Sequence, residues 1–179
     1  RRHSSAASDV YKRQIKYCLI IFICLINVHC YAENITLEIL SAKVIKVVDG
    51  DTVYLKHKEY GKLKIRLADI DAPEKDQPHG IDATETLKKL IDKRSVMLKK
   101  ITVDRYNRIV GIIYANDVEI NYYLVRNGYA WCYDKYNKRA KIKNAENMAR
   151  LEKIGLWSNQ SEPPIAPWVW RKNKGKKNE

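Results

Sequence analysis

The sequence predicts a mainly β protein with helices (α+β), in which five strands close into a Greek-key barrel in the order β-β-β-α-β-β-α-α. Short runs of β-branched and other apolar residues, bounded by Gly, Asn and Asp, predict the strands. Segments with helical spacing follow the third and the fifth strand. Because strands and helices do not alternate one by one, this order argues against a parallel sheet and for a closed barrel.

Three of the strands are predicted next to one another at the start of the folded domain. The runs ILSAKVIKVVD (39–49), TVYLKH (52–57) and KLKIRLADI (62–70) are separated by short polar links that contain Gly50 and Gly61. Links of this length and composition join antiparallel neighbours, so the three runs predict a meander.

The remaining two strands form a predicted hairpin. SVMLKKITVD (95–104) and IVGIIYA (109–115) flank RYNR, in which Asn107 can take the left-handed conformation that a tight turn needs. Together with the meander, this hairpin supplies the five strands of an OB-fold, the small Greek-key barrel that the order of elements fits best.

Three segments carry helix signals. DATETLKKLIDKR (82–94) has apolar residues at helical spacing, with Asp82 as the expected N-cap and Glu85 at the offset of a capping box. VEINYYLVRNG (118–128) predicts a short helix that ends at an Asn-Gly pair. A longer helix is expected over residues 138–154, where apolar residues again form one stripe.

Composition divides the chain into four parts. Residues 1–14 lack apolar periodicity and are interpreted as a disordered leader or an artefact. Residues 15–32 contain an apolar run that is short for a membrane span of about 20 residues, which predicts a signal peptide cleaved after Ala32, with an uncleaved anchor as the alternative. A single OB-fold domain is expected over 33–160, followed by a Pro- and Lys-rich tail, 161–179, without regular structure.

The net charge and the positions of the cysteines indicate what kind of partner the protein binds and whether it contains a disulfide. The chain has 34 Lys and Arg against 21 Asp and Glu, a formal net charge of +13 at pH 7, which favours a polyanionic partner such as nucleic acid. Of the four cysteines, Cys132 alone lies beyond the predicted signal peptide, so an internal disulfide is excluded in the mature domain. The signal peptide predicts secretion, extracellular or periplasmic, without stable membrane association after cleavage.

Acidic and basic residues gather at the ends of the predicted strands. VVDGDTVYL places Asp51 between the first two strands, RLADIDAPE places Arg66, Asp71 and Glu74 at the end of the third, and DRYNR brings Arg108. Carboxylates are hard oxygen ligands for Ca²⁺, arginine forks bind phosphate, and a further carboxylate can take a proton from water. Such a set is what metal-assisted hydrolysis of a phosphodiester requires.

These motifs, together with LVRNGYAW and GLWS, resemble those of the staphylococcal nuclease (thermonuclease) family of secreted, calcium-dependent nucleases. The resemblance covers residues 42–158, with the motifs in the family's order, and PWVWRK (167–172) is similar to the C-terminal end of many bacterial members. The resemblance implies an OB-fold endonuclease that acts on DNA and RNA with little sequence preference and leaves 3′-phosphate ends.

The resemblance also implies a metal site and a proton acceptor. Asp51, Asp71 and the main-chain carbonyl of Ala72 are expected to bind Ca²⁺. The best-known member has Thr in place of Ala72, but a backbone ligand does not need the hydroxyl. Glu74 is expected to act as the general base or to orient the attacking water.

For the nucleic acid itself, the resemblance implies two groups of contacts. Arg66 and Arg108 are expected to bind the scissile phosphate. Further substrate contacts are expected from Arg105 and Tyr106, at a terminal phosphate, and from Tyr133 or Tyr136, as a ring that stacks on a base.

Other residues of chemically reactive types are not expected to take part directly in catalysis or metal binding. Asp49 is expected to stabilise the turn or to position the neighbouring Asp51 rather than to bind the metal. His57 and His79 show no metal-ligand pairing. Cys132 has no His nearby in sequence and is interpreted as a small packed residue. The role of Asp69, an additional acid beside the metal motif, stays open.

Two classes of function are compatible with the predicted barrel. The first is a secreted, Ca²⁺-dependent endonuclease that acts on DNA and RNA as a monomer. The alternative is a non-catalytic OB-fold module that binds nucleic acid or protein. Because the complete set of acids and arginines is present in the sequence, the enzyme is the favoured hypothesis.

Overall fold

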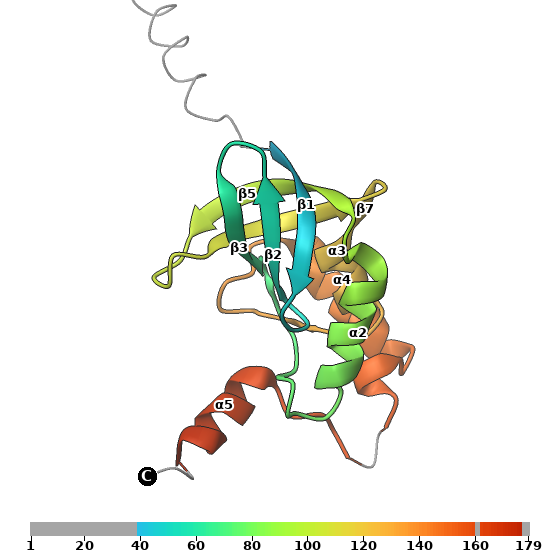
Figure 1. Ribbon diagram of the computed structural model, residues 1–179. Helices are drawn as coiled ribbons and strands as arrows, with labels where there is room; N and C mark the ends of the chain where they lie inside the picture. Colours follow the sequence, from blue (N-terminus) through green and yellow to red (C-terminus); the bar gives the residue numbers. More distant parts are fainter. Residues whose placement is uncertain (1–38, 160–161, 177–179) are drawn as a thin grey trace, which may run out of the picture. The chain divides into compact units, whose positions relative to one another are not determined.

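A computed structural model describes residues 39–159 and 162–176 of the 179-residue chain (Figure 1). The predicted leader, 1–14, and the predicted signal peptide, 15–32, lie outside the described residues. Within the two described ranges, no helix has the length and apolar character needed to cross a membrane.

Five strands close into a barrel, which confirms the predicted fold class. β1 (Ile39–Val47), β2 (Thr52–His57) and β3 (Gly61–Leu67) form the antiparallel meander and lie side by side in Figure 1. β5 (Ser95–Val103) pairs with β1, and β6 (Ile109–Ala115) pairs antiparallel with β5. A parallel pairing of β3 with β6 closes the sheet.

Three strands of two residues each extend this arrangement. β4 (Ile70–Asp71) pairs with β8 (Trp131–Cys132), and β7 (Val118–Glu119) pairs with the end of β6. The sequence does not reveal them, because two residues are too few for a period-2 pattern. The β4–β8 pair matters for function, since it fixes the backbone of one of the predicted metal ligands.

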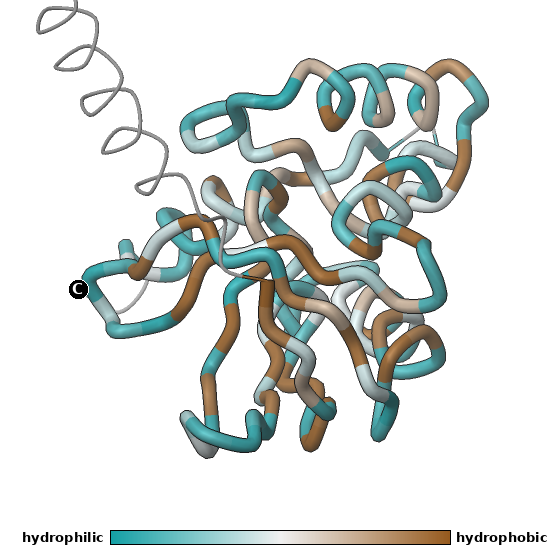
Figure 2. The backbone as a smooth tube through the Cα atoms, turned by 90° about the horizontal axis from the view of Figure 1, so that it is seen from above, coloured by the Kyte–Doolittle hydropathy of each residue, from teal (hydrophilic) through white to brown (hydrophobic). Residues whose placement is uncertain are grey.

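Helices gather on one side of the barrel in Figure 1. They are α2 (Gly80–Ile91), α3 (Ile120–Arg126) and α4 (Ala140–Leu151), followed by the short 3₁₀ helix η2 (Gly155–Trp157). The inner faces of α2, α3 and α4 share one core with the barrel interior, whereas Leu156 and Trp157 of η2 belong to a second apolar cluster. Figure 2 shows how hydrophobic and hydrophilic residues alternate along the strands that enclose this core.

The start of α2 differs from the prediction. Asp82 is not the N-cap but lies in the first turn, and the N-cap position is occupied by His79 in a left-handed conformation with φ 68°. The backbone N–H of Gly80 donates to the carbonyl of Gln77, so a tight turn starts the helix three residues earlier than the capping-box pattern predicts. At the β5–β6 turn, by contrast, Asn107 has φ 58°, the left-handed conformation expected there.

The prediction that the tail lacks regular structure is wrong for α5 (Pro167–Lys176). Pro is favourable at the first position of a helix, and the carbonyl of Ala166 accepts hydrogen bonds from the N–H groups of Val169 and Trp170. Trp168 packs edge-on against Trp131, with ring centroids 5.6 Å apart. Tertiary packing of aromatic residues therefore stabilises a helix whose local composition is unfavourable.

Gly50, within the Asp49-Gly50-Asp51 link, is needed for close packing. A Cβ at this position would lie 2.7 Å from the Cβ of Ala72 and 2.8 Å from that of Ala83. We expect Gly50→Ala to lower the free energy of unfolding by about 1–3 kcal/mol, the usual cost of overpacking, measured by urea denaturation. Gly175→Ala is the control, because nothing lies within 4 Å of its Cβ. Wild-type stability of the Gly50 variant would contradict the close approach.

Candidate active site

Asp51 lies directly before β2, and its side chain is nearly buried. Its Oδ2 accepts a hydrogen bond from the backbone N–H of Ala72 at 2.9 Å, and its Oδ1 accepts one from the Thr52 hydroxyl at 3.0 Å. The first of these bonds ties the β1–β2 link to the residue that follows β4. Two sequence motifs of the predicted site therefore meet in space.

Arg66 joins the two predicted carboxylate ligands. Its Nη2 lies 2.7 Å from Oδ1 of Asp71 and 3.0 Å from Oδ2 of Asp51. The side chain of Asp71 is 1% exposed and that of Arg66 13% exposed. A buried charge is costly unless it is paired, so Arg66 acts as counter-ion to both carboxylates. The structure thus brings these three predicted residues together.

Asp49 adds a third carboxyl group, and we call Asp49, Asp51 and Asp71 the acidic cluster. The Oδ1 of Asp49 accepts a hydrogen bond from the N–H of Asp51 at 3.1 Å. Burial, followed by the charge of Asp51, raises the pKa of Asp49 to about 6. Burial also raises the pKa of Asp71, against the opposing effect of its hydrogen bond with Arg171. Burial therefore makes the carboxyl groups of Asp49 and Asp71 harder to ionise than that of an exposed Asp.

Glu74 lies in the loop after β4 and is joined to Asp71 by a residue that the sequence analysis missed. Arg171 of α5 places its Nη1 2.7 Å from Oε1 of Glu74 and its Nη2 2.7 Å from Oδ2 of Asp71. The loop is also held by Gln77, whose Oε1 accepts the N–H of Glu74 and whose Nε2 donates to the carbonyl of Ile165. The tail of the chain therefore contributes to the position of Glu74.

The oxygen atoms at this place suit a hard cation. Asp51 and Asp71 offer carboxylates, and buried Ala72 directly follows Asp71 with its main-chain carbonyl. In residues 39–159 and 162–176, no group of three or more His, Cys, Asp or Glu side chains is arranged to hold a metal ion. A cation here must therefore use a backbone oxygen and water in addition to the two carboxylates. Ca²⁺ accepts such a mixed set of oxygen ligands, so the residues fit the predicted ion.

Arg108 lies at the β5–β6 hairpin and is paired with Asp104 rather than with the acidic cluster. Its N–H donates to Oδ1 of Asp104 at 2.9 Å and its Nε to Oδ2 at 2.7 Å. Within the described parts of the chain, its two terminal nitrogens have no hydrogen-bond partner. Asp104 thus orients the guanidinium group of Arg108 and leaves its two terminal nitrogens available to bind a phosphate.

The other predicted residues of the hairpin are exposed. Nη2 of Arg105 donates to the hydroxyl of Tyr106 at 2.7 Å, and the guanidinium carbon lies 4.8 Å from the centre of the ring. Tyr106 is 65% exposed. Both residues are accessible to a ligand, as a terminal-phosphate site requires.

The two candidate stacking tyrosines differ in their surroundings. The ring of Tyr133 is stacked on Trp168, with centroids 5.3 Å apart and planes 4° from parallel. Tyr136 meets Tyr133 edge-on at 4.8 Å and is 59% exposed. One face of Tyr133 is therefore covered by α5, while Tyr136 is the more accessible ring.

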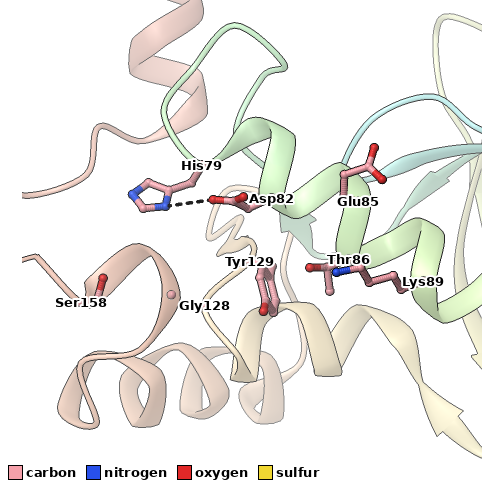
Figure 3. Close-up of a pocket in the computed structure, with 9 residues that line it drawn as sticks. His79, Asp82, Glu85, Thr86, Lys89, Gly128, Tyr129 and Ser158 are labelled. Atoms are coloured by element: carbon pink, nitrogen blue, oxygen red, sulfur yellow. Dashed lines mark ion pairs between the residues drawn. The ribbon is translucent and has the colours of Figure 1, made fainter.

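A separate cleft of about 410 Å³ contains none of the predicted site residues (Figure 3). One wall comes from α2, including Asp82 and Lys89, and the opposite wall includes Gly128 and Ser158. His79 at its edge has Nδ1 3.9 Å from Oδ2 of Asp82. Of the catalytic candidates, Arg66 and Glu74 lie instead beside the acidic cluster, and Arg108 lies at the β5–β6 hairpin.

Comparison with known proteins identifies the family of this chain. A sequence model described as staphylococcal nuclease homologue matches residues 64–159. The chain belongs to the staphylococcal nuclease family. Of the candidates above, Asp51 and Arg171 lie outside the matched range, and the residues from Arg66 to Tyr136 lie within it.

Several relatives in this family are similar over most of the chain. An uncharacterized endonuclease of Escherichia coli is 39% identical over 136 residues, which cover 75% of this chain and 87% of the relative. A micrococcal nuclease of Shigella flexneri is 35% identical over 142 residues, 73% of this chain and 79% of the relative. The staphylococcal-like nuclease CAN1 of Arabidopsis thaliana is 41% identical over 113 residues, 63% of this chain and 34% of the relative.

In this member of the nuclease family, Asp69 has a structural partner. Asp69 lies in the turn between β3 and β4 with φ 66°, and its Oδ2 accepts a hydrogen bond from Nε of Arg139 at 2.6 Å. Nη1 of Arg139 also lies 2.7 Å from Oε1 of Glu119. This ion-pair network ties the turn to β7 and to the start of α4, and it answers the question that the sequence left open.

Cys132 is a packed residue rather than a nucleophile. It is 1% exposed, and burial raises the pKa of its thiol from 9.0 to about 12. Because the folded pKa exceeds the unfolded value, any stability from this shift is complete below pH 9.0 and is lost as the pH rises through about 12.

Near neutral pH we expect iodoacetamide to alkylate Cys132 far more slowly in the native protein than in urea, measured by peptide mass spectrometry. Equal rates would contradict the burial.

Proposed function

We propose that this member of the staphylococcal nuclease family is a Ca²⁺-dependent endonuclease that hydrolyses DNA and RNA with little sequence preference and leaves 3′-phosphate ends. The observation that carries the proposal is the meeting of Asp51, Arg66 and Asp71, with Glu74 held beside them. The names of the relatives, endonuclease and micrococcal nuclease, support the class of reaction.

In the proposed reaction, the arginines bind the phosphate and Glu74 accepts a proton. Arg66, held by the two carboxylates, and Arg108, oriented by Asp104, bind the scissile phosphate and stabilise the negative charge that develops on it. Glu74, once its carboxylate is free of Arg171, accepts a proton from the attacking water. When bound at Asp51, Asp71 and the Ala72 carbonyl, Ca²⁺ supplies further positive charge for the same purpose.

The proposal is tested by digestion of labelled single- and double-stranded DNA and RNA with Ca²⁺, Mg²⁺ or a chelator. We expect cleavage with Ca²⁺ and much less with Mg²⁺, because Mg²⁺ demands tighter octahedral geometry and loses water reluctantly. Analysis of the product ends should show 3′-phosphates. Full activity in excess chelator would refute the metal dependence, and binding without cleavage under every condition would favour a non-catalytic OB-fold module.

We also propose that the mature protein is secreted as a soluble monomer that begins near Glu33, since the apolar run before Ala32 is short for a membrane span. N-terminal sequencing of the exported protein should find this new end, and sedimentation should report a single chain. Recovery of the protein from membranes with residues 17–28 still attached would favour the uncleaved anchor.

A further inference from the structure

A row of lysines covers the outer face of the β1–β2–β3 meander. All five side chains belong to exposed residues of these strands, and buried residues such as Val44, Leu55 and Ile65 lie next to them in sequence. The three strands contain no Asp or Glu. We call this surface the lysine face, and its members are Lys43, Lys46, Lys56, Lys62 and Lys64.

The strand register brings like charges together on the lysine face. Lys56 of β2 lies directly opposite Lys43 of β1 on one side and Lys62 of β3 on the other. Across residues 39–159 and 162–176, none of the five lysines forms an ion pair. Like charges directly opposite each other destabilise a sheet, so this arrangement has an energetic cost that a bound polyanion would relieve.

Tyr54 lies in the middle of the face. It pairs in register with Lys46 on one side and Lys64 on the other. The Nζ of Lys62 lies 4.3 Å from the centre of its ring, and that of Lys64 lies 5.9 Å from it. These cation–π contacts hold the ammonium groups above the sheet without neutralising them.

The lysine face is continuous with the candidate active site. Arg66 is the next residue after Lys64 on the same side of β3, and it lies opposite Thr52, which follows Asp51. Alternate residues of a strand are about 6.6 Å apart, so Lys62, Lys64 and Arg66 form a row of basic residues on one side of β3 that ends at the acidic cluster.

We propose that the lysine face binds the sugar-phosphate backbone of a nucleic-acid strand beyond the phosphate that is cleaved. This inference rests on the proposed function, because it assumes that the phosphate at Arg66 belongs to a longer chain. The face supplies charge without base-specific groups, which suits an enzyme with little sequence preference.

The test compares two variants that each lose two positive charges. Lys62→Gln/Lys64→Gln alters the lysine face, and Lys89→Gln/Lys153→Gln alters exposed lysines elsewhere. Binding of labelled oligo-dT is measured at several salt concentrations in the presence of chelator, so that no cleavage occurs. The salt dependence of the affinity should fall by about 1.4 in logarithmic slope for the first variant, about 0.7 for each lost phosphate contact, and stay unchanged for the second.

Each outcome separates this inference from the proposed function. If both variants bind with the wild-type slope, the lysine face is not a binding surface, although nucleic-acid binding stands. An equal decrease in both variants would mean general attraction by net charge and would also overturn the inference. If no protein binds oligo-dT, the proposed substrate class is wrong and the inference fails with it.

A second, independent observation concerns α5, which occupies two parts of the candidate site at once. Arg171 binds Oδ2 of Asp71 and Oε1 of Glu74, while Trp168 covers one face of Tyr133. Lys174 pairs with Asp76 in the same loop as Glu74. The helix is therefore attached to the site through three side chains spaced three residues apart along one face.

These contacts conflict with the binding of a cation and a nucleotide. A guanidinium group and Ca²⁺ are both positive, and both would use the carboxylate oxygens of Asp71. A base cannot stack on the face of Tyr133 that Trp168 covers. The geometry points to α5 as an internal competitor that must move aside for productive binding, and this inference also rests on the proposed function.

Calorimetric titration of Ca²⁺ tests the competition without an activity measurement. Arg171→Gln should bind Ca²⁺ at least about fivefold more tightly than wild type, within the usual range of internal coupling. Lys172→Gln removes the same charge from an exposed position of α5 and should match wild type. Arg66 still neutralises Asp51 and Asp71 in the variant, so the fold should persist, which circular dichroism can check.

Limited proteolysis provides the second readout. If α5 is displaced, Ca²⁺ should accelerate tryptic cleavage after Arg171 and Lys172 in the wild-type protein. Equal Ca²⁺ affinity of wild type and Arg171→Gln would overturn the competition while the metal site stands. Weaker binding by the variant would make Arg171 a supporting residue instead, and absence of Ca²⁺ binding in both would reject the proposed metal site together with this inference.

Discussion

Replacing Arg66 by Lys should reduce the rate of phosphodiester cleavage about a hundredfold, equivalent to the loss of about 3 kcal/mol of transition-state stabilisation that is typical of a removed charge-stabilising donor. Lys keeps the positive charge beside Asp51 and Asp71 but has no planar fork with which to hold a phosphate by two bonds. The measurement is kcat/KM on a labelled oligonucleotide with Ca²⁺, with unfolding followed in parallel.

The choice of Lys matters because Arg66 also has a structural role. Removing the charge altogether would leave two nearly buried carboxylates without this partner, a change that typically costs about 3–5 kcal/mol of stability. Arg126→Lys is the matched control, because Arg126 pairs with Glu152 at the surface, away from the acidic cluster. Wild-type turnover by Arg66→Lys would place the phosphate site elsewhere.

The strands were predictable because their pattern is local. The expected strands at 52–57 and 109–115 coincide with β2 and β6, where apolar residues are confined between turn residues. The predicted run at 62–70 is interrupted by Asp69, whose left-handed conformation divides it into β3 and β4. No local rule requires an Asp to adopt this conformation, and its partner Arg139 lies far along the chain.

The meeting of Asp51 and Asp71 was predictable for the same reason, since Asp51 precedes β2 and Asp71 comes after β3, and the start of one antiparallel strand lies beside the end of the next. The role of α5 was not, because Arg171 lies 100 residues from Asp71 in sequence. The resemblance of PWVWRK to other C-termini singled out the segment, but sequence reasoning had no way to connect it with a carboxylate on another element. Long-range ion pairs of this kind depend on the packing of the tryptophans that hold the helix.

Replacing Asp51 by Asn should strongly weaken Ca²⁺ binding, whereas the same change at Asp49 should preserve it. Asp51 reaches the N–H of Ala72, beside the carbonyl that is the third proposed ligand, so its carboxylate lies among the proposed metal ligands. When the charge of Asp51 is removed, Asp71 remains as the one anionic ligand of the proposed set. The affinity of the site for a hard cation falls as the negative charge of its ligands decreases. The amide oxygen of Asn can still accept the Ala72 N–H, so the fold should survive.

Asp49 has a different task in the same turn. Its Oδ1 accepts the N–H of Asp51, a bond that the side-chain oxygen of Asn can replace, and its raised pKa reflects burial rather than a strong cationic partner. Calorimetric titration of Ca²⁺ into Asp51→Asn and Asp49→Asn, with circular dichroism to verify folding, separates a ligand from a residue that supports it. Loss of binding in Asp49→Asn together with intact binding in Asp51→Asn would reverse the assignment, and the metal would then lie on the β1 side of the turn, away from Ala72.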